Sequence, residues 1–242
     1  MKHENKVVLV TGAGQGMGKA MACRFAREGA KVVAVDVNPD AASATAAQCG
    51  NGAIGIGCDV SDSAAVKDAI ALAVNTLGRL DVLVNNAGVG SVDQLLDTPD
   101  EHWTRVIGVN LTGTFYFCRE AARVMQGNGG CIINVSSTAV ATGEGPSHYV
   151  ASKAGVMGLT RSIARELAPL GIRVNTLVPG PTNTPMMAGI PDEWTQAMIN
   201  AIPLGRMGEP EDIAAVASFL ASADAGFVTG QNIAVNGGMA FL

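Results

Sequence analysis

Tyr149 and Lys153 have the residue types and the spacing for proton-transfer chemistry. They lie in the stretch 149–167, where apolar residues recur with helical spacing. On a helix, residues four apart share one face, one turn from each other. A tyrosine hydroxyl with a pKa near ~10 exchanges protons poorly at neutral pH, and a nearby ammonium lowers that pKa. The pair therefore suits general acid/base catalysis, although the same spacing also fits a core tyrosine beside a lysine that reaches solvent.

A glycine-rich turn offers a second kind of chemistry, the binding of phosphate. The segment Thr11–Gly18 follows the β-branched run 6–10 and precedes an amphipathic helix expected over 19–28. Glycines at 12, 16 and 18 allow a ligand to approach the backbone closely, and the start of a helix presents free N–H groups to an anion. The spacing Gly-x-x-x-Gly-x-Gly differs from the Gly-x-Gly-x-x-Gly dinucleotide fingerprint. Its place directly after the first strand still predicts a dinucleotide phosphate site.

Asp36 closes the next apolar run, 31–35, and bears on the choice of dinucleotide. A carboxylate at this point accepts hydrogen bonds from the 2′-hydroxyl of an adenosine ribose and repels a 2′-phosphate. The residue before Gly16 is the uncharged Gln15, and nothing basic in the glycine turn offsets that repulsion. We therefore favour NAD over NADP as the cofactor. The alternative is that Asp36 is a turn residue before Asn38 and Pro39.

Strands and helices that alternate along the chain would position these residues. Strand-like apolar runs occupy 6–10, 31–35, 53–58, 80–84, 131–135, 172–178 and 232–235. The helical patterns between them include 61–77, a long region over 100–126, and one from 209 to about 221. The alternation predicts an α/β fold, namely a Rossmann-type, doubly wound, seven-stranded parallel sheet in a single domain.

Ligands bind outside the carboxyl ends of the strands in such sheets. Asp59 and Val60, and the segment Asn85–Gly88, follow two predicted strands and should share that rim with the glycine turn. Asp59 could instead cap the helix that begins near residue 61. Asn110 stands inside a helical run, where asparagine is disfavoured, which suggests contact with water or substrate.

Composition excludes several classes of protein. The net charge is −5 with no basic block, which argues against nucleic-acid binding, and no apolar stretch reaches the ~18 residues that span a membrane. The N-terminus has no signal-peptide pattern, and five scattered cysteines suggest reduced, mostly buried thiols in a cytoplasmic protein. The three histidines have no metal-ligand spacing, so we expect no metal site.

Across essentially its whole length the chain resembles the short-chain dehydrogenases/reductases. The resemblance rests on the order and separation of Thr11–Gly18, Asn85–Gly88, Asn110, Asn134–Ser137, Tyr149–Lys153 and Pro179–Pro181. It implies a catalytic set of Asn110, a serine after the fifth strand, Tyr149 and Lys153. Tyr149 would be the general acid/base, Lys153 would lower its pKa and bind the nicotinamide ribose, the serine would hold the substrate oxygen, and Asn110 would hold a water that links Lys153 to solvent.

The resemblance also implies a larger set of residues around the dinucleotide. The candidates are Gly12, Gln15, Gly16, Met17, Gly18, Asp36, Asp59, Val60, Asn86, Ala87, Gly88, Tyr149, Lys153, Pro179, Gly180, Thr182 and Thr184. Of the two threonines, Thr184 is favoured for contact with the nicotinamide carboxamide.

Two adjacent serines compete for the catalytic position. Counting back from the tyrosine, as the family usually places its serine, gives Ser136, whereas the Asn-x-Ser-Ser motif at the strand end gives Ser137. A one-residue slip in a strand turns side chains to the opposite face, whereas a loop absorbs a deletion more easily. We therefore choose Ser137.

The segment 185–207 leaves the regular rhythm and contains methionines and a tryptophan, which suggests a substrate lid with an apolar wall. The alternative is ordinary packing of a small helix. The end of the chain, from Gly226, resembles the family's subunit contact and, with only 15% charged residues, suggests a homotetramer.

The expected function is NAD-dependent interconversion of a small-molecule secondary alcohol and a ketone. One alternative is a 3-oxoacyl thioester (acyl carrier protein) reductase that uses NADPH. Another is a non-catalytic nucleotide sensor on the same fold, which would be expected to have lost members of the catalytic set.

Overall fold

The computed structural model describes residues 1–241, and its centre is one parallel sheet. The strands are β1 (Val7–Thr11), β2 (Lys31–Asp36), β3 (Ile54–Gly57), β4 (Val82–Asn85), β5 (Gly130–Val135), β6 (Ile172–Pro179) and β7 (Asn232–Val235). They pair in the order β3-β2-β1-β4-β5-β6-β7, so the chain winds outward in both directions from β1. The predicted doubly wound, seven-stranded parallel sheet is confirmed.

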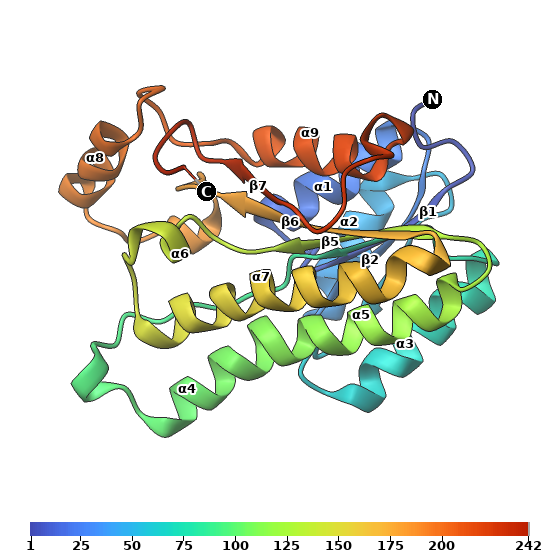
Figure 1. The fold of residues 1–242 in the computed structure, drawn as a ribbon, viewed down its shortest axis with the longest axis horizontal. Coiled ribbons are helices and arrows are strands. Elements are labelled where there is room, and N and C mark those ends of the chain that lie inside the picture. Colours follow the sequence, from blue (N-terminus) through green and yellow to red (C-terminus); the bar gives the residue numbers. More distant parts are fainter. Residues whose placement is uncertain (242) are drawn as a thin grey trace.

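Helices cover both faces of the sheet (Figure 1). On one face lie α1 (Gly16–Arg27), α2 (Pro39–Cys49) and α9 (Pro210–Ala221), which pack on a buried cluster that includes Val8, Val10 and Ile133. On the other lie α3 (Ser63–Leu77), α5 (Gly113–Met125) and α7 (Ser147–Leu167), around a cluster with Leu9, Leu83 and Ile132. Successive residues of β1 thus enter opposite cores, as the pleat of a strand requires.

The start of α1 differs from the other helix starts on its face of the sheet. Asn38 caps α2 with its side chain, and α9 begins with a capping box of Glu209 and Asp212. Gln15 precedes α1 but makes no side-chain cap, and the first turn holds no acidic residue. The first N–H groups of α1 therefore remain available to a ligand.

The long helical region predicted over 100–126 contains an interruption. It consists of α4 (Asp100–Ile107), a π-helical turn (Gly108–Thr112) and α5. Asn110 is fully buried in that turn, and its backbone carbonyl accepts a hydrogen bond from Thr114 Oγ1 at 2.7 Å. The wide turn carries the Asn110 side chain toward the rim of the sheet.

The remaining short helices are α6 (Ala139–Thr142), between β5 and α7, and α8 (Asp192–Ala201), after β6. Within residues 1–241, none of the helices is long and apolar enough to cross a membrane.

Candidate active site

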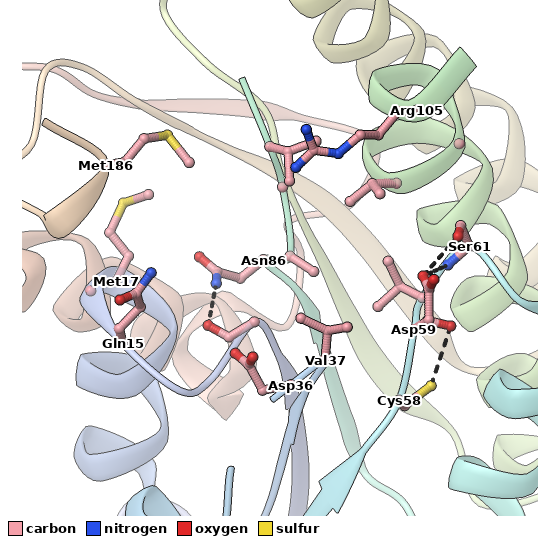
Figure 2. A pocket seen from close by; sticks show the side chains of 18 of the residues that line it. Gln15, Met17, Asp36, Val37, Cys58, Asp59, Ser61, Asn86, Arg105 and Met186 are labelled. Atoms are coloured by element: carbon pink, nitrogen blue, oxygen red, sulfur yellow. Dashed lines mark hydrogen bonds between the residues drawn. The ribbon is translucent and has the colours of Figure 1, made fainter. Parts of the chain in front are cut away.

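A cavity of about 1100 Å³ opens at the carboxyl ends of the central strands. Its lining includes eleven of the residues predicted to hold a dinucleotide: Gly12, Gln15, Gly16, Met17, Asp36, Asp59, Val60, Asn86, Ala87, Gly88 and Thr184. The volume lies at the upper end of the range for small-molecule and cofactor sites. Figure 2 shows side chains from the start of α1, the ends of β2 and β3, and α4 arranged around this space.

The glycine turn and Asp36 hold each other in place. Asp36 Oδ2 accepts a 2.9 Å hydrogen bond from the Gly14 N–H, and Oδ1 accepts one from Asn38 N–H at 3.0 Å. A Cβ atom on Gly14 would lie 2.8 Å from Asp36 Oδ2, closer than real Cβ atoms approach. Gly14 was not among the predicted site residues, because its role depends on a contact with a residue 22 positions away.

Gly12 and Gly18 are required for a different close approach. Gly12 has a φ of +62°, and a Cβ on Gly18 would lie 2.0 Å from the Gly12 carbonyl oxygen. Any side chain at position 18 would therefore push α1 away from the strand end. Gly18 is outside the cavity lining, and its place in the structure is that of a packing residue.

Asn86 has a polar atom that the surrounding protein leaves unused. Its Nδ2 donates to the carbonyl oxygens of Thr11 and Gly12 at 3.0 and 3.1 Å. Its Oδ1 is buried and has no hydrogen-bond partner among the described residues. Buried acceptors are normally satisfied, so this oxygen suits a hydroxyl donor brought by a ligand.

Asp59 and Ser61 form a small polar group at the part of the cavity next to the end of β3. Asp59 Oδ1 accepts hydrogen bonds from the Ser61 N–H at 2.9 Å and from Ser61 Oγ at 2.7 Å. The cap of α3 is Asp62, whose side chain accepts from Ala64 and Ala65. The alternative that Asp59 caps this helix is therefore wrong.

Tyr149 and Lys153 lie one turn apart near the start of α7. Neither belongs to the cavity lining, but Lys153 Nζ lies beside Gly88, which does. Lys153 Nζ donates a 2.9 Å hydrogen bond to the Val135 carbonyl oxygen and lies 5.9 Å from the centroid of the Tyr149 ring. Lys153 is only 4% exposed, and burial lowers its pKa to about 8. Because that value lies above 7, the ammonium form still predominates at neutral pH.

The phenol of Tyr149 is influenced more by burial than by its polar neighbours. Burial raises the pKa of its hydroxyl above the ordinary value, and a hydrogen bond with the Ser137 side chain lowers it. We expected Lys153 to lower the pKa of Tyr149 as well, but only burial and Ser137 shift it. Ser137 is thus the polar side chain that acts on the Tyr149 hydroxyl.

The two serines after β5 point to different surroundings. Ser136 is buried, and its Oγ donates to the Lys153 carbonyl oxygen at 2.8 Å. Ser137 is half-buried; it hydrogen-bonds Tyr149 and accepts from the Ala139 N–H at 3.2 Å. Only the Ser137 hydroxyl therefore faces the same space as the tyrosine.

The Asn110 side chain hydrogen-bonds the loop after β4. Its Oδ1 accepts from the Val89 N–H at 2.8 Å, and its Nδ2 donates to the Val89 carbonyl oxygen and to Ser152 Oγ, both at 3.0 Å. A Cβ atom on Gly88 would lie 3.3 Å from Lys153 Nζ and 3.4 Å from Asn110 Oδ1. The space beside Gly88 is thus bounded by both polar groups.

The segment after β6 separates the two predicted threonines. Thr184 lines the cavity, whereas Thr182 is buried and donates to the Gly180 carbonyl oxygen at 2.9 Å. Pro179 is the last residue of β6, and a Cβ on Gly180 would lie 2.9 Å from the Asn236 Cα. Thr182, Pro179 and Gly180 therefore hold the backbone in place, and Thr184 is the residue that reaches the cavity.

Several lining residues were not predicted from the sequence. Cys58, Ser61 and Arg105 belong to the lining, and all three are labelled in Figure 2, as is Met186 from the predicted lid segment. Cys58 and Ser61 flank the predicted residues Asp59 and Val60 after β3, so the expectation that ligands bind at the carboxyl ends of strands could have included them. Arg105 reaches the cavity from α4. The sequence around it did not indicate this, because it depends on how α4 packs over the rim in the folded chain.

His148, next to Tyr149, is fully buried rather than exposed to the cavity. Its Nε2 hydrogen-bonds Ser91 Oγ at 2.6 Å and thereby ties α7 to the loop after β4.

Comparison with known proteins gives the same picture over the whole chain. A family model described as enoyl-(acyl carrier protein) reductase matches residues 12–240. The chain is 41% identical to a meso-2,3-butanediol dehydrogenase of Serratia marcescens, covering 98% of this chain and 96% of that protein. It is also 41% identical to a 3-oxoacyl-[acyl-carrier-protein] reductase of Thermotoga maritima, covering 99% of each. A solved short-chain type dehydrogenase/reductase from Mycobacterium marinum superposes with a TM-score of 0.94 at 36% identity, covering 100% of this chain and 98% of that one.

These full-length matches to dehydrogenases and reductases thus agree with three features of the structure: the sheet order, the glycine turn with Asp36, and the Tyr149–Lys153 pair. The chain belongs to the short-chain dehydrogenase/reductase family, whose members oxidise or reduce at CH–OH groups.

Proposed function

We propose that the protein is an NAD-dependent oxidoreductase that interconverts a secondary alcohol and a ketone. The observation that carries the proposal is that Tyr149 has Ser137 and Lys153 as neighbours, and that Lys153 Nζ lies beside Gly88, a residue of the cavity lining. A proton-transferring hydroxyl, a cation and a second hydroxyl thus stand beside a space suited to a dinucleotide.

The residues present fit the binding of a nicotinamide dinucleotide. The uncapped start of α1 and the backbone from Gly12 to Gly16 would hold the phosphates, and the unused Asn86 Oδ1 would accept from a ribose hydroxyl. Asp36 would hold the adenosine ribose, and Thr184 would contact the nicotinamide end. When bound, the nicotinamide supplies or accepts the hydride.

The chain's own residues would handle the proton and the substrate oxygen. In alcohol oxidation Tyr149 takes the hydroxyl proton, and in ketone reduction it donates one to the carbonyl oxygen. Ser137 donates a hydrogen bond to the same oxygen and keeps it facing Tyr149. Lys153, protonated at neutral pH, would bind the nicotinamide ribose, and Asn110 would support a water path from Lys153 along the gap beside Gly88.

Asp36 supports NAD over NADP. Its carboxylate lines the cavity and is held by two backbone N–H groups, so it cannot turn away easily from a 2′-phosphate. Arg105 is the basic residue in the lining, and it lies on α4 rather than beside the glycine turn.

A second candidate is reduction of a 3-oxoacyl thioester with NADPH, which the likeness to the Thermotoga maritima reductase supports. The likeness to the Serratia marcescens dehydrogenase supports a small alcohol such as 2,3-butanediol. Initial rates with NADH and NADPH, measured on acetoin and on a 3-oxoacyl thioester, distinguish them. Faster turnover of the thioester with NADPH than of any alcohol or ketone with NADH or NAD would overturn the first proposal.

The segment 185–207 would form a lid over the substrate. Met186 lines the cavity, and α8 has no buried residue, which disfavours packing of a small helix into the core. Trp194 is 65% exposed on α8 and would form part of an apolar substrate wall.

We also propose a homotetramer in the cytoplasm. Phe219 on α9 and Phe227 before β7 are exposed aromatic residues near the chain end that carries the family resemblance. A single monomer mass by light scattering at micromolar concentration would refute the assembly.

A further inference from the structure

We propose that Cys23 and Cys49 form a redox-active dithiol, which a peroxide closes to an intramolecular disulfide between α1 and α2. The proposal concerns a site separate from the dinucleotide cavity and does not rest on the proposed function.

The two cysteines come together because α1 and α2 lie beside each other on one face of the sheet (Figure 1). Cys23 lies in the second half of α1, and Cys49 is the last residue of α2. Thr45 Oγ1 donates to the Ala13 carbonyl oxygen at 2.9 Å, and Asn51 Nδ2 donates to the Ala30 carbonyl oxygen at 3.2 Å. These bonds join α2 and the turn after it to the segments that precede and follow α1, and so hold Cys49 near α1.

The thiols are in direct contact and reachable from outside. The Cys23 thiol is close enough to Cys49 to raise the pKa of its thiol, and both side chains line the same cavity. Both are half-buried, whereas Cys58, Cys118 and Cys131 are buried. Cys23 and Cys49 line a second cavity of about 490 Å³, which shares only Gly16 and Pro185 with the dinucleotide cavity. A small oxidant can therefore enter without crossing the active site.

Charge distinguishes the two sulfurs. Lys19 and Arg27 lie four residues before and after Cys23, on the same face of α1, and both line this second cavity. The thiolate is the form of a cysteine that attacks a peroxide. Burial and the neighbouring Cys23 raise the pKa of the Cys49 thiol to about 12, so Cys49 stays protonated at neutral pH. Cys23 is thus the attacking residue and Cys49 the resolving residue, an arrangement typical of redox-sensing thiols.

The chemistry balances with hydrogen peroxide as the oxidant. The Cys23 sulfur attacks one peroxide oxygen, the O–O bond breaks, and a sulfenic acid and one water result. The Cys49 sulfur then attacks the Cys23 sulfur, the S–O bond breaks, and the departing hydroxide leaves with the Cys49 proton as a second water. Two thiols lose two electrons and two protons, and one peroxide becomes two waters.

The test is intact-mass spectrometry of the full chain after brief treatment with hydrogen peroxide. We expect a loss of about 2 Da, two fewer thiols alkylated in denaturant, and recovery of both with dithiothreitol. A peptide map should show the Cys23–Cys49 link. Absence of the mass loss, or a disulfide-linked dimer on a non-reducing gel in its place, would overturn the proposal.

Two single variants separate the roles, and neither measurement depends on turnover. Cys49→Ser should retain oxidation at Cys23 and gain about 16 or 32 Da instead of losing 2, because the resolving thiol is gone. Cys23→Ser should show neither change at the same peroxide dose. A 2 Da loss that persists in Cys23→Ser would assign the bond to another pair and overturn the proposal. Cys58→Ser, which alters a buried thiol of the other cavity, is the matched control and should oxidise as the wild type does.

Discussion

Ser136 Oγ donates a 2.8 Å hydrogen bond to the backbone carbonyl oxygen of Lys153 and so joins the end of β5 to the second turn of α7. The bond occupies the Ser136 hydroxyl with the scaffold. It also leaves the next residue, Ser137, as the serine that meets Tyr149. The sequence left the choice between the two serines open. The structure suggests that Ser136 has a positioning role and that Ser137 would contact the substrate.

We predict opposite effects of removing each hydroxyl. Ser137→Ala should lower kcat by about 10²- to 10³-fold, the usual cost of losing a hydrogen bond to a developing charge, with a melting temperature close to that of the wild type. Ser136→Ala should lower the free energy of unfolding by about 0.5–1.5 kcal/mol, because one buried hydrogen bond is lost, and should keep most of the turnover. Steady-state kinetics and thermal denaturation of both variants measure this. Loss of turnover in Ser136→Ala with activity retained in Ser137→Ala would reverse the assignment.

Removal of the Tyr149 hydroxyl tests the proton-transfer role. Tyr149→Phe should reduce turnover by ~10²- to 10⁴-fold in both directions, while NADH still binds and its fluorescence still saturates on titration. Unchanged turnover in this variant would exclude Tyr149 as the general acid/base.

The raised pKa of Tyr149 predicts different pH profiles for the two directions. Alcohol oxidation needs the phenolate, which is the minor form below the pKa and increases about tenfold per pH unit. Between about pH 6 and 8, log kcat/KM for oxidation should therefore rise with pH, whereas ketone reduction, which needs the neutral hydroxyl, should stay nearly constant. Parallel profiles in the two directions would contradict this assignment of protonation states.

How far the sequence predicts this molecule differs between its backbone and its site. Apolar runs such as 32–35 are buried on both faces, and a parallel sheet covered by helices satisfies them, so the sheet type and most strand boundaries could be predicted. The π-helical turn at Asn110 could not, because it depends on hydrogen bonds to Val89 and Ser152 that form only in the folded chain. The same holds for Gly14 and Arg105, whose positions depend on β2 and on the path of α4.

Burial of Lys153 should cost stability in a pH-dependent way. Its pKa falls from 10.5 to about 8 on folding, so the unfolded chain binds more protons between these values and stability rises with pH across that window. Below about pH 8 the full cost applies, on the order of 3 kcal/mol. Lys153→Met removes this cost but also a charged hydrogen bond to Val135 of about 1.5 kcal/mol. The variant should therefore be inactive yet melt at a higher temperature than the wild type at pH 7, with the difference shrinking toward pH 10. A lower melting temperature at pH 7 would show that Lys153 stabilises the fold.

Asp36 should control the choice between dinucleotides. Asp36→Ser removes the charge that repels a 2′-phosphate and weakens the acceptor for the ribose, so the ratio of kcat/KM for NADH to that for NADPH should fall by about 10- to 100-fold. The ratio is measured with one ketone at fixed pH and salt concentration. A wild-type preference for NADPH, or a ratio unaffected by the substitution, would remove Asp36 as the determinant.

A substitution at Gly88 tests the proposed proton path without removing any polar side chain. In Gly88→Ala the new Cβ would lie 3.3 Å from Lys153 Nζ and 3.4 Å from Asn110 Oδ1, so one of these groups must shift by a few tenths of an ångström. Since small misplacements of a catalytic group are costly, kcat should fall on the order of 10- to 100-fold. Gly90→Ala is the matched control in the same loop, because a Cβ there meets nothing within 4 Å and should leave kcat unchanged. Equal kcat values for the two variants would show that the space between Lys153 and Asn110 has no part in turnover.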